Sequence, residues 1–467
     1  MSKLQLRPYQ IEIAEKAAEI LHEHGLVYLA MECRTGKSFS AMQTAVNIGA
    51  KSVLFITTKK AIPSIETDYK RLKEDNPYIF SLKVTNYEDI LAKQKAVEKA
   101  ATAIVADKYP GIAVRSVRFQ RELATEKIRQ RELLAPYTTP DNIDVVIVDE
   151  AHKAGAFPRP SGTQQAIRNI ARDKKVIFLS GTPTPESSSQ MFHVLQISDR
   201  SPWAQYRTFY DWVRAGYVKP KEKMLNGYKI TDYSDADFPH IKKDIDHLII
   251  SLTQQEAGFT TEIEEHTLYS DLLPSTHESL LQLRRNRVAK VYMQDGSTAE
   301  IIANTPADLL NKMHQLSGGT IIIEGNGYIV DESKAHDIAR MFAGRHIAIF
   351  TCYQAEKELL IRTFPNWTDV PEVFNKDKEK TFICQIRSCR EGVSLATADA
   401  LVYYNPEYSY LSYEQGKQRA VTKDKKKASQ VWFSVSNCGI ERNILEAVRE
   451  KQDFTLQWYY QNYGRYD

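Results

Sequence analysis

The order of apolar and polar stretches along the chain predicts two blocks in which strands and helices alternate. In the first block, an amphipathic helix over residues 10–24 places Ile11, Ala14, Ala18 and Leu21 on one face. Short, apolar, β-branched-rich runs follow, with helical stretches between them. These runs predict strands at residues 27–31, 52–57, 81–84, 145–148 and 176–179. Such alternation is typical of a parallel sheet that is covered by helices on both faces.

A second block repeats this alternation near the end of the chain. Strands are expected at residues 347–351, 381–386, 400–404 and 431–434, and helices at residues 355–362, 411–420 and 440–451. The predicted fold class is therefore α/β with two lobes of similar size. We expect lobe 1 at residues 1–197, a mixed α/β inter-lobe region with helices and hairpins at 198–340, and lobe 2 with a C-terminal helix and tail at 341–467.

Two regions interrupt the alternation. Residues 91–140 are rich in Lys, Arg, Glu and Ala and are expected to be a mostly helical insertion, either solvated or facing nucleic acid. Its basic residues include Arg115, Arg118, Arg121, Lys127, Arg129 and Arg131. In the inter-lobe region, Asp295-Gly296 predicts a hairpin turn, and Gly325-Asn326-Gly327 predicts a second one.

Composition and charge narrow the class of protein. The 467 residues have a net charge of only +3, so affinity for nucleic acid would have to come from local basic surfaces. The five cysteines include no C-x-x-C pair, which argues against a disulfide framework or a zinc site and favours a reducing cytoplasm. The N-terminus has no apolar signal region, and no apolar run approaches the roughly 20 residues of a membrane span. We expect a soluble cytoplasmic protein without a membrane partner.

A candidate phosphate-binding loop lies between the first predicted strand and the helix that follows it. Thr35-Gly36-Lys37-Ser38 has the Gly-Lys-Ser core of such loops, although Met31 stands where the full pattern has its first glycine. Backbone N–H groups of the loop and the helix N-terminus would face phosphate oxygens. Lys37 would reach the β- and γ-phosphates, and the Ser38 hydroxyl would bind Mg²⁺.

Two carboxylates follow the predicted strand at residues 145–148. Asp149 would hold Mg²⁺ directly or through water, and Glu150 is placed to polarise the attacking water as a general base. Hydrolysis of a magnesium-bound nucleotide needs both a phosphate loop and these acidic groups. The sequence therefore predicts an ATPase that uses ATP and Mg²⁺, with Lys37, Asp149 and Glu150 as catalytic residues.

Several motifs in the first block resemble those of superfamily-two helicases and translocases. Asp149-Glu150-Ala151-His152 is similar to their DEAH box, and Ser180-Gly181-Thr182-Pro183 to their third motif. The resemblance implies two tandem RecA-like lobes and gives His152, Ser180 and Thr182 a role in coupling nucleotide state to the nucleic-acid cleft. Leu6-Arg7-Pro8-Tyr9-Gln10 resembles the adenine-reading element, which implies nucleotide contacts from Arg7 and Gln10.

The resemblance continues into the second block. Glu391-Gly392-Val393-Ser394-Leu395 is similar to the fifth motif, and Tyr413-Glu414-Gln415 through Arg419 to the sixth. These matches imply that Gly392, Gln415 and Arg419 join Arg34, Thr35, Gly36, Lys37 and Ser38 in binding ATP. The segments 57–60, 85–88 and 350–353 stand where the family grips the phosphate backbone. The nucleic-acid contacts implied are Thr57, Lys59, Lys60, Asn86, Thr351 and Ser388.

The whole ordered series is most similar to compact Snf-type motors, including phage-encoded forms. If the protein is phage-encoded, the cytoplasm expected is that of the host. Two positions depart from the family pattern. Arg34 stands where a glycine is usual, and Thr422 stands where the sixth motif has its final arginine. An arginine there offsets charge that develops on the transferred phosphoryl group. The alternatives are that Arg419 does this work, that Lys423 or another residue does, or that turnover is slow.

The expected function is an ATP-driven helicase or translocase whose partner is DNA, single- or double-stranded, rather than RNA. Three alternatives remain open: a duplex translocase or annealing motor that does not separate strands, the motor subunit of a restriction or defence complex, and a weakly hydrolysing, ATP-switched DNA-binding protein. We expect the chain to work as a monomer, with a nuclease or a replication or recombination protein as the candidate partner.

Overall fold

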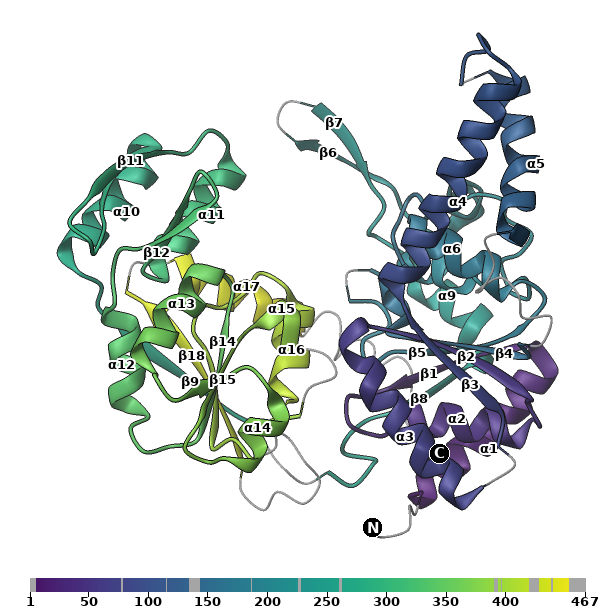
Figure 1. Cartoon of the computed structure of the whole chain (residues 1–467), viewed down its shortest axis with the longest axis horizontal. Helices are drawn as coiled ribbons and strands as arrows, with labels where there is room; N and C mark the ends of the chain where they lie inside the picture. The colour runs from purple at the N-terminus through teal and green to yellow at the C-terminus, as the bar shows by residue number, and fades with distance from the viewer. Residues whose placement is uncertain are drawn as a thin grey trace. The chain divides into compact units, whose positions relative to one another are not determined.

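A computed structural model describes most of the chain in two compact units, which divide between Ala257 and Gly258 (Figure 1). The residues described are 6–76, 79–114, 116–133, 143–185, 187–225, 228–259, 263–389, 394–395, 397–419, 428–437 and 440–452. The stretch 198–340, expected as one inter-lobe region, is shared between the two units. Described residues up to 257 belong with the first sheet, and described residues from 258 to 452 belong with the second.

The first unit is built on a six-stranded sheet in which all the strands are parallel. Its order is β3-β2-β4-β5-β1-β8, with strands β1 (Leu26–Met31), β2 (Ser52–Thr57), β3 (Ser81–Asn86), β4 (Val145–Asp149), β5 (Lys175–Leu179) and β8 (Ile249–Leu252). Every residue of β1 and β4 is buried, as the continuous apolar runs predict. Strand β8, at the edge beside β1, was not predicted from the sequence.

Helices cover both faces of this sheet. Figure 1 shows α1 (Pro8–His24), α2 (Lys37–Asn47) and α3 (Ile62–Asp75) on one side, and α6 (Gly162–Ala171) and α9 (Phe238–Ile245) on the other. Further elements complete the unit: η1 (Lys59–Ala61), η2 (Ala151–Ala154), α7 (Gln190–Leu195), α8 (Phe209–Trp212), the π-helix η3 (Val213–Tyr217), η4 (Asp246–Leu248) and the antiparallel hairpin β6 (Lys221–Leu225) and β7 (Tyr228–Asp232).

The insertion is a helical hairpin, as its composition predicts. Helices α4 (Tyr87–Lys108) and α5 (Val117–Leu133) lie side by side and extend away from the sheet (Figure 1). They share a small core of their own, formed by Ala101, Val105, Phe119 and Leu123. Arg115 and residues 134–140 of the expected insertion lie outside the described residues.

The second unit has another six-stranded parallel sheet, in the order β15-β16-β14-β17-β18-β9. Alternate residues of its strands point into two separate cores, so Ala348 and Phe350 pack in one while Ile347 and Ile349 pack in the other. The strands are β9 (Ile263–Ser270), β14 (Ile347–Thr351), β15 (Trp367–Thr368), β16 (Thr381–Gln385), β17 (Ala400–Tyr403) and β18 (Ser429–Ser436). The predicted α/β class with two parallel sheets is confirmed.

Two hairpins and eight helices complete the description of this unit within the residues that are placed. The hairpins are β10 (Val288–Tyr292) with β11 (Thr298–Ile302), and β12 (Thr320–Ile323) with β13 (Asn326–Ile329). The helices are α10 (Pro274–Asn286), α11 (Pro306–Ser317), α12 (Ser333–Met341), α13 (Gln354–Thr363), α14 (Pro371–Lys376), α15 (Ile386–Cys389), α16 (Tyr410–Lys417) and α17 (Ile440–Gln452).

One turn prediction was misplaced. The second hairpin turns at Glu324 and Gly325, which have φ of 50° and 85°, while Asn326 already pairs with Ile323. Two consecutive left-handed residues form the tight turn that matches the twist of paired strands. The prediction placed the turn one residue too late, because it was based on the two glycines in residues 325–327.

Two findings concern the cysteines and the membrane. Cys384 and Cys389 form a disulfide, although the scattered cysteines had argued against disulfide bonding. Cys384 lies in strand β16 and Cys389 in helix α15, and the Cα atoms of the two cysteines are 6.6 Å apart. Sequence spacing alone does not reveal this proximity. None of the helices in the described part of the chain is long and apolar enough to cross a membrane.

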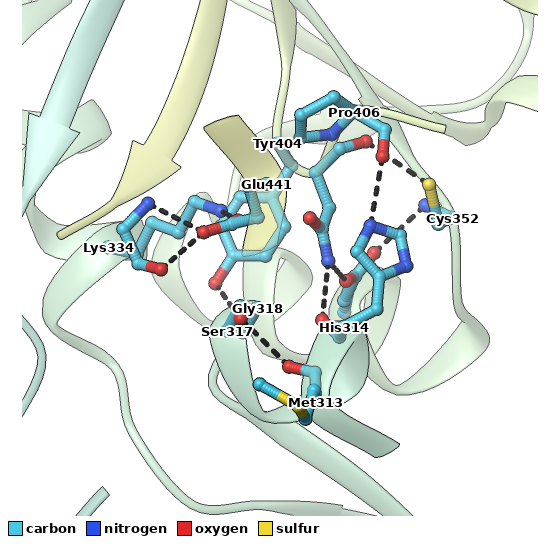
Figure 2. A network of polar contacts seen from close by, with 12 residues as sticks. Met313, His314, Ser317, Gly318, Lys334, Cys352, Tyr404, Pro406 and Glu441 are labelled. Atoms are coloured by element: carbon cyan, nitrogen blue, oxygen red, sulfur yellow. Dashed lines mark hydrogen bonds and ion pairs between the residues drawn. The ribbon is translucent and has the colours of Figure 1, made fainter. Parts of the chain in front are cut away.

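A fully buried ion pair anchors the second unit. Lys334 of α12 pairs with Glu441 of α17, and both side chains have 0% exposure (Figure 2). The Ser436 N–H donates to the other Glu441 oxygen at 2.6 Å, and the Lys334 ammonium lies 5.1 Å from the ring centroid of Tyr404. The Tyr404 hydroxyl in turn donates to the Gly318 carbonyl at 2.8 Å. This network joins α11, α12, α17 and the ends of β17 and β18.

Removing one member of this pair should destabilise the protein strongly. We expect Lys334→Ala to lower the free energy of unfolding by about 3–5 kcal/mol, because Glu441 would stay buried without its counter-charge. The double variant Lys334→Met/Glu441→Leu should be closer to wild type. Urea-induced unfolding of the full chain measures both effects.

A surface ion pair on the same helix provides the control. Arg442 and Glu446 lie 3.0 Å apart with side-chain exposures of 68% and 56%, so Arg442→Ala should change the free energy of unfolding by no more than about 0.5 kcal/mol. Equal losses from Lys334→Ala and Arg442→Ala would contradict the anchoring role.

Candidate nucleotide site and nucleic-acid contacts

The loop between β1 and α2 has the backbone geometry that close approach to phosphates requires. Arg34 and Gly36 are both left-handed, with φ of 66° and 86°. This conformation costs a residue with a Cβ about 1–2 kcal/mol, whereas glycine adopts it freely. That cost applies to Arg34 and not to Gly36. Lys37 and Ser38 are the first two residues of α2, so their N–H groups point out of its N-terminus.

Side chains from elsewhere in the first unit hold this loop. The Thr35 hydroxyl donates to the Glu32 carbonyl at 2.8 Å, and the Tyr9 hydroxyl donates to the Thr35 carbonyl at 3.0 Å. Gln254, which follows β8, donates from Nε2 to the Cys33 carbonyl at 2.8 Å and from its N–H to Glu32 Oε2 at 2.5 Å. The loop is therefore held by Tyr9, near the beginning of the first unit's sequence, and by Gln254, near its end.

The two predicted carboxylates stand at the end of β4. Asp149 is its last residue and is buried, and Oδ2 accepts a hydrogen bond from the Thr57 hydroxyl at 2.7 Å. Glu150 has φ of 51°, a left-handed conformation that turns its side chain toward Lys37. Glu150 Oε1 lies 3.7 Å from Lys37 Nζ. The structure thus brings together the predicted phosphate-binding lysine and the predicted general base.

The predicted coupling residues join the same cluster. His152 Nδ1 lies 2.9 Å from Ser180 Oγ and 3.5 Å from Glu150 Oε2. Ser180 Oγ also accepts a hydrogen bond from the Thr182 N–H at 3.1 Å. A Cβ at Gly181 would stand only 3.3 Å from Lys37 Nζ, so the glycine leaves the space that the lysine occupies. His152 therefore connects Glu150 to the segment after β5.

The expected adenine-reading element lies against the phosphate loop. Gln10 is buried in the first turn of α1, and a Cβ at Gly36 would come within 2.0 Å of its Nε2 atom. Gln10 Oε1 accepts a hydrogen bond from the Arg7 N–H at 2.8 Å, and an Arg7 guanidinium N–H donates to the Tyr9 hydroxyl at 3.0 Å. The structure places Arg7 and Gln10 beside the loop that the sequence assigned to the same nucleotide.

The predicted nucleic-acid contacts of the first unit differ in exposure. Lys59 and Lys60 are exposed in η1, directly after β2. Thr57 is fully buried with its hydroxyl on Asp149, and Asn86 is buried as the N-cap of α4, where its side chain accepts from the Asp89 N–H at 2.9 Å. Of these four residues, the structure leaves only the two lysines accessible to a polyanion.

The predicted contacts of the second unit also differ. Ser388 is exposed in α15, whereas Thr351 is fully buried at the end of β14. Beside Thr351, Glu356 accepts hydrogen bonds from the N–H groups of Cys352 and Tyr353 at 2.8 and 3.1 Å. Burial raises the pKa of Glu356 to about 7 in spite of these donors. Thr351 is therefore part of a buried polar layer and does not face solvent.

A neutral histidine completes this layer. Burial is the main cause that lowers the pKa of His314 to about 4, so the ring has one proton at neutral pH. His314 Nε2 lies 2.9 Å from the Pro406 carbonyl, which can only accept (Figure 2). His314 Nδ1 lies 2.9 Å from the Tyr353 hydroxyl. The proton therefore belongs on Nε2, and Nδ1 accepts from Tyr353.

Helix α16 and the turn that follows it carry Gln415 and Arg419, two predicted residues of the sixth motif. Gln415 is buried, and Arg419 is buried with its Nε donating to the Gln415 carbonyl at 2.8 Å. Lys417 fixes this helix to β9 through Glu265 Oε1 at 2.8 Å. Burial alone would raise the pKa of Glu265, but Lys417 and its other hydrogen-bonding and charged neighbours bring it below its usual value. Gly392, Thr422 and Lys423 lie outside the described residues.

The donor set of the first unit fits a magnesium-bound nucleoside triphosphate. For the phosphates, the fit rests on the left-handed loop and on Lys37 beside Gly181. For Mg²⁺, it rests on the Ser38 hydroxyl and the Asp149 carboxylate, because Mg²⁺ prefers oxygen ligands. A Cβ at Gly36 or Gly181 would crowd this cradle. Within the described ranges, no group of three or more His, Cys, Asp or Glu side chains could hold a metal ion.

Three residues shape this site in ways that the sequence did not predict. Thr57 donates to the Asp149 carboxylate, the Tyr87 hydroxyl donates to the Asp149 carbonyl, and Gln254 braces the phosphate loop. The first could have been found from strand order, since β2 and β4 pair with Ile56 opposite Val148. Nothing in the sequence near Gln254 signals its role, because β8 is a short edge strand far along the chain.

The Thr57 hydroxyl should matter through Asp149. We expect Thr57→Val to lower the free energy of unfolding by about 1.5–3 kcal/mol, because a buried carboxylate would lose a hydrogen-bond donor while the side-chain volume is kept. Thr57→Ser keeps the hydroxyl and should recover most of the loss. Thermal and urea unfolding of the three proteins measure this, and a valine variant as stable as wild type would contradict the bond.

Part of the first unit matches a known sequence family. Residues 3–185 match the family described as "Type III restriction enzyme, res subunit". No curated protein matches the chain. Among solved structures, two of the Sulfolobus solfataricus SWI2/SNF2 ATPase core, one of them in complex with dsDNA, align over 97% of this chain and 92% and 90% of theirs. Their sequence identities to this chain are 14% and 13%, and the TM-scores are 0.38 and 0.37.

Proposed function

We propose that the protein is an ATP-driven motor that acts on nucleic acid, with DNA as the substrate. The observation that carries this proposal is the meeting of Lys37, Glu150, His152 and Ser180 within one network of contacts, beside an Asp149 held by Thr57. In this set, Lys37 is suited to phosphate binding, Asp149 to metal binding and Glu150 to general-base catalysis, and His152 contacts both Glu150 and Ser180. A protein that only binds nucleotide needs the first of these functions alone.

Each residue has a defined role in the proposal. Lys37 and the loop N–H groups hold phosphate oxygens, while Ser38 and Asp149 hold Mg²⁺, which supplies charge neutralisation on the phosphates when bound. Glu150 orients and deprotonates the attacking water. Glu150 contacts His152, and His152 contacts Ser180. In the proposal, these contacts couple the position of the Glu150 carboxylate to the segment after β5.

The motor part of the proposal rests on the second sheet and on exposed cations. A simple phosphate-loop kinase has no use for a second α/β unit with the sixth-motif residues Gln415 and Arg419. Lys59, Lys60 and Ser388 are exposed and suited to phosphate contacts, which position a strand without reading its sequence. The family match over residues 3–185 agrees with an enzyme that acts on DNA. We also propose that Arg419 offsets the charge that develops on the transferred phosphoryl group in the transition state.

ATP hydrolysis measured with and without nucleic acid tests this function. We expect stimulation by DNA that exceeds stimulation by RNA, and we expect Lys37→Ala and Glu150→Gln to lower turnover by about 10²-fold or more, since each removes a group that acts on the reacting phosphate or water. Lys16→Ala and Glu12→Gln are matched controls, because these residues form an exposed pair on α1 with a separation of 2.9 Å.

The outcomes separate the remaining alternatives. Unchanged turnover in both site variants would overturn the assignment, and nucleotide binding without turnover in wild type would favour an ATP-switched binding protein. Triplex displacement without unwinding of a forked duplex would identify a translocase that does not separate strands. Unwinding of the fork would identify a helicase.

A second candidate function follows from the family match. The description of the family that residues 3–185 match names a restriction enzyme subunit. This favours the role of motor subunit in a restriction or defence complex. We then expect a nuclease to co-purify with the full chain and to cut DNA only when ATP is hydrolysed. Nuclease activity that persists with the Glu150→Gln protein would contradict this role.

A further inference from the structure

A hollow on the first unit is lined by cations that the proposed nucleotide site does not use. It has a volume of about 610 Å³, within the range of about 300–1,000 Å³ that is usual for ligand sites. Helices α4, α5, α6 and α7 and the segment before α8 form its walls. We call it the arginine pocket, after Arg159, Arg168, Arg172 and Arg207, which line it together with Lys127.

The arginines of this pocket have no internal counter-charge. Among the described residues, the side chains of Arg159, Arg168, Arg172 and Arg207 make no hydrogen bond and no ion pair. The carboxylates on the same walls are Glu98, which pairs with Lys127 at 3.0 Å, and Asp199, which accepts from the Asp173 N–H at 3.3 Å. Four guanidinium groups are thus gathered around one hollow in this part of the described chain, which favours an anionic ligand.

Local structure explains how the arginines come together. Arg168 lies in the last turn of α6, and Arg172 is the residue directly after that helix. Arg159 stands just before the N-terminus of α6, and Arg207 reaches the pocket from the segment that leads into α8. All four are exposed. Tertiary packing therefore collects cations that are up to 48 positions apart in the sequence (159 to 207).

The floor of the pocket is polar, and hydrogen bonds to backbone carbonyls hold its side chains. His193 donates from Nδ1 to the Ala156 carbonyl at 2.7 Å, and Gln164 Nε2 donates to the His193 carbonyl at 3.0 Å. Burial is the main cause that lowers the pKa of His193 to about 4, and the nearby Arg168 lowers it further. The floor is therefore neutral at physiological pH, and the positive charge comes from the arginines above it.

An aromatic residue at the same hollow narrows the class of ligand. Tyr210 is 38% exposed among the lining residues, whereas its neighbour Phe209 is buried. Exposed arginines suit phosphodiester oxygens, which they bind with paired N–H groups, and an exposed aromatic ring suits an unstacked base. Bases are unstacked and accessible in single strands rather than in a duplex.

We propose that the arginine pocket binds the phosphate backbone of a single nucleic-acid strand, with a base against Tyr210. This inference rests on the proposed action on nucleic acid and adds a strand-binding site on the helical insertion and α6, outside the motif segments. It also decides between the two readings of the insertion, because α4 and α5 supply a wall of the pocket and are not merely a solvated arm.

Direct binding without nucleotide tests the proposal independently of ATP hydrolysis. Fluorescence anisotropy of a labelled single-stranded oligonucleotide should show at least tenfold weaker binding by Arg168→Glu/Arg172→Glu and by Arg207→Glu than by wild type. The slope of log K against log salt concentration should become shallower by about 0.7 for each phosphate that the variant no longer neutralises. Tyr210→Ala should weaken binding of the single strand about tenfold and leave duplex binding unchanged.

Arg71→Glu is the matched control, because Arg71 is exposed on α3 and outside the pocket. It makes the same charge change as Arg207→Glu, half that of Arg168→Glu/Arg172→Glu, and should bind like wild type. Pocket variants that bind the oligonucleotide as tightly as Arg71→Glu would overturn the inference while leaving the proposed function intact. Wild type that binds no nucleic acid would overturn both.

Free anions distinguish the strand from other phosphate sources. Inorganic phosphate and ATP, each added as a competitor, should displace the oligonucleotide only at concentrations at which an equal ionic strength of sodium chloride does so. Displacement at much lower ATP concentrations that disappears in Arg168→Glu/Arg172→Glu would show that the pocket takes a free nucleotide, and would overturn the assignment to a strand.

Discussion

All strands of the first sheet run in the same direction, and this constraint creates the candidate nucleotide site. Because the strands are parallel, every carboxyl end opens onto the same edge. The loop with Lys37 follows β1, Thr57 ends β2, Asn86 ends β3, Asp149 ends β4, and Ser180 follows β5. Gln254 follows β8, the added edge strand. Groups that lie far apart in the sequence therefore meet without any long side chain reaching across the fold.

The same edge also concentrates unusual backbone conformations. Arg34, Gly36 and Glu150 are all left-handed, and for two of them this conformation has a steric cost. Such residues persist only where their surroundings hold them in place. Here Gln254 and Tyr9 brace the loop, and η2 begins directly after Glu150. At this edge, the strain lies in the two turns whose N–H and carboxylate groups the proposed chemistry uses.

The second unit uses its parallel sheet differently. At the ends of β14 and β17, the polar groups form a closed, buried layer of Thr351, Glu356, His314 and Asn405. Burial keeps His314 neutral and holds Glu356 near its protonation midpoint at neutral pH. Asn405 Nδ2 donates hydrogen bonds to Glu356 and to the His314 carbonyl, whereas the Thr351 hydroxyl and Asn405 Oδ1 have no hydrogen-bond partner among the described residues. Exposed cations in the described parts of the first unit, including Lys59, Lys60 and the arginine pocket, are better suited to a polyanion.

The sequence alone predicted most of the strands and the two-sheet fold class, and it named residues that the structure brings together at one edge of the first sheet. Apolar runs of β-branched residues are local signals, and a Gly-Lys-Ser core before a helix binds phosphate by its local geometry. The exposure of a side chain and its hydrogen-bond partners depend on tertiary packing and not on neighbouring residues in the sequence. For this reason the sequence did not reveal that Thr57, Asn86 and Thr351 are buried. Their side chains face neighbouring strands or cap a helix, and which neighbour they meet depends on sheet order.

Tertiary structure decided what distant segments contribute. The edge strands β8 and β9 are short or mixed in pattern, and they acquire their places only by pairing with β1 and β18. The arginine pocket has no sequence motif at all, since its cations come from separate segments that join only when α4, α5 and α6 pack together. Chemistry within one turn or loop can be read from residue order, whereas chemistry shared between elements depends on how their faces pack.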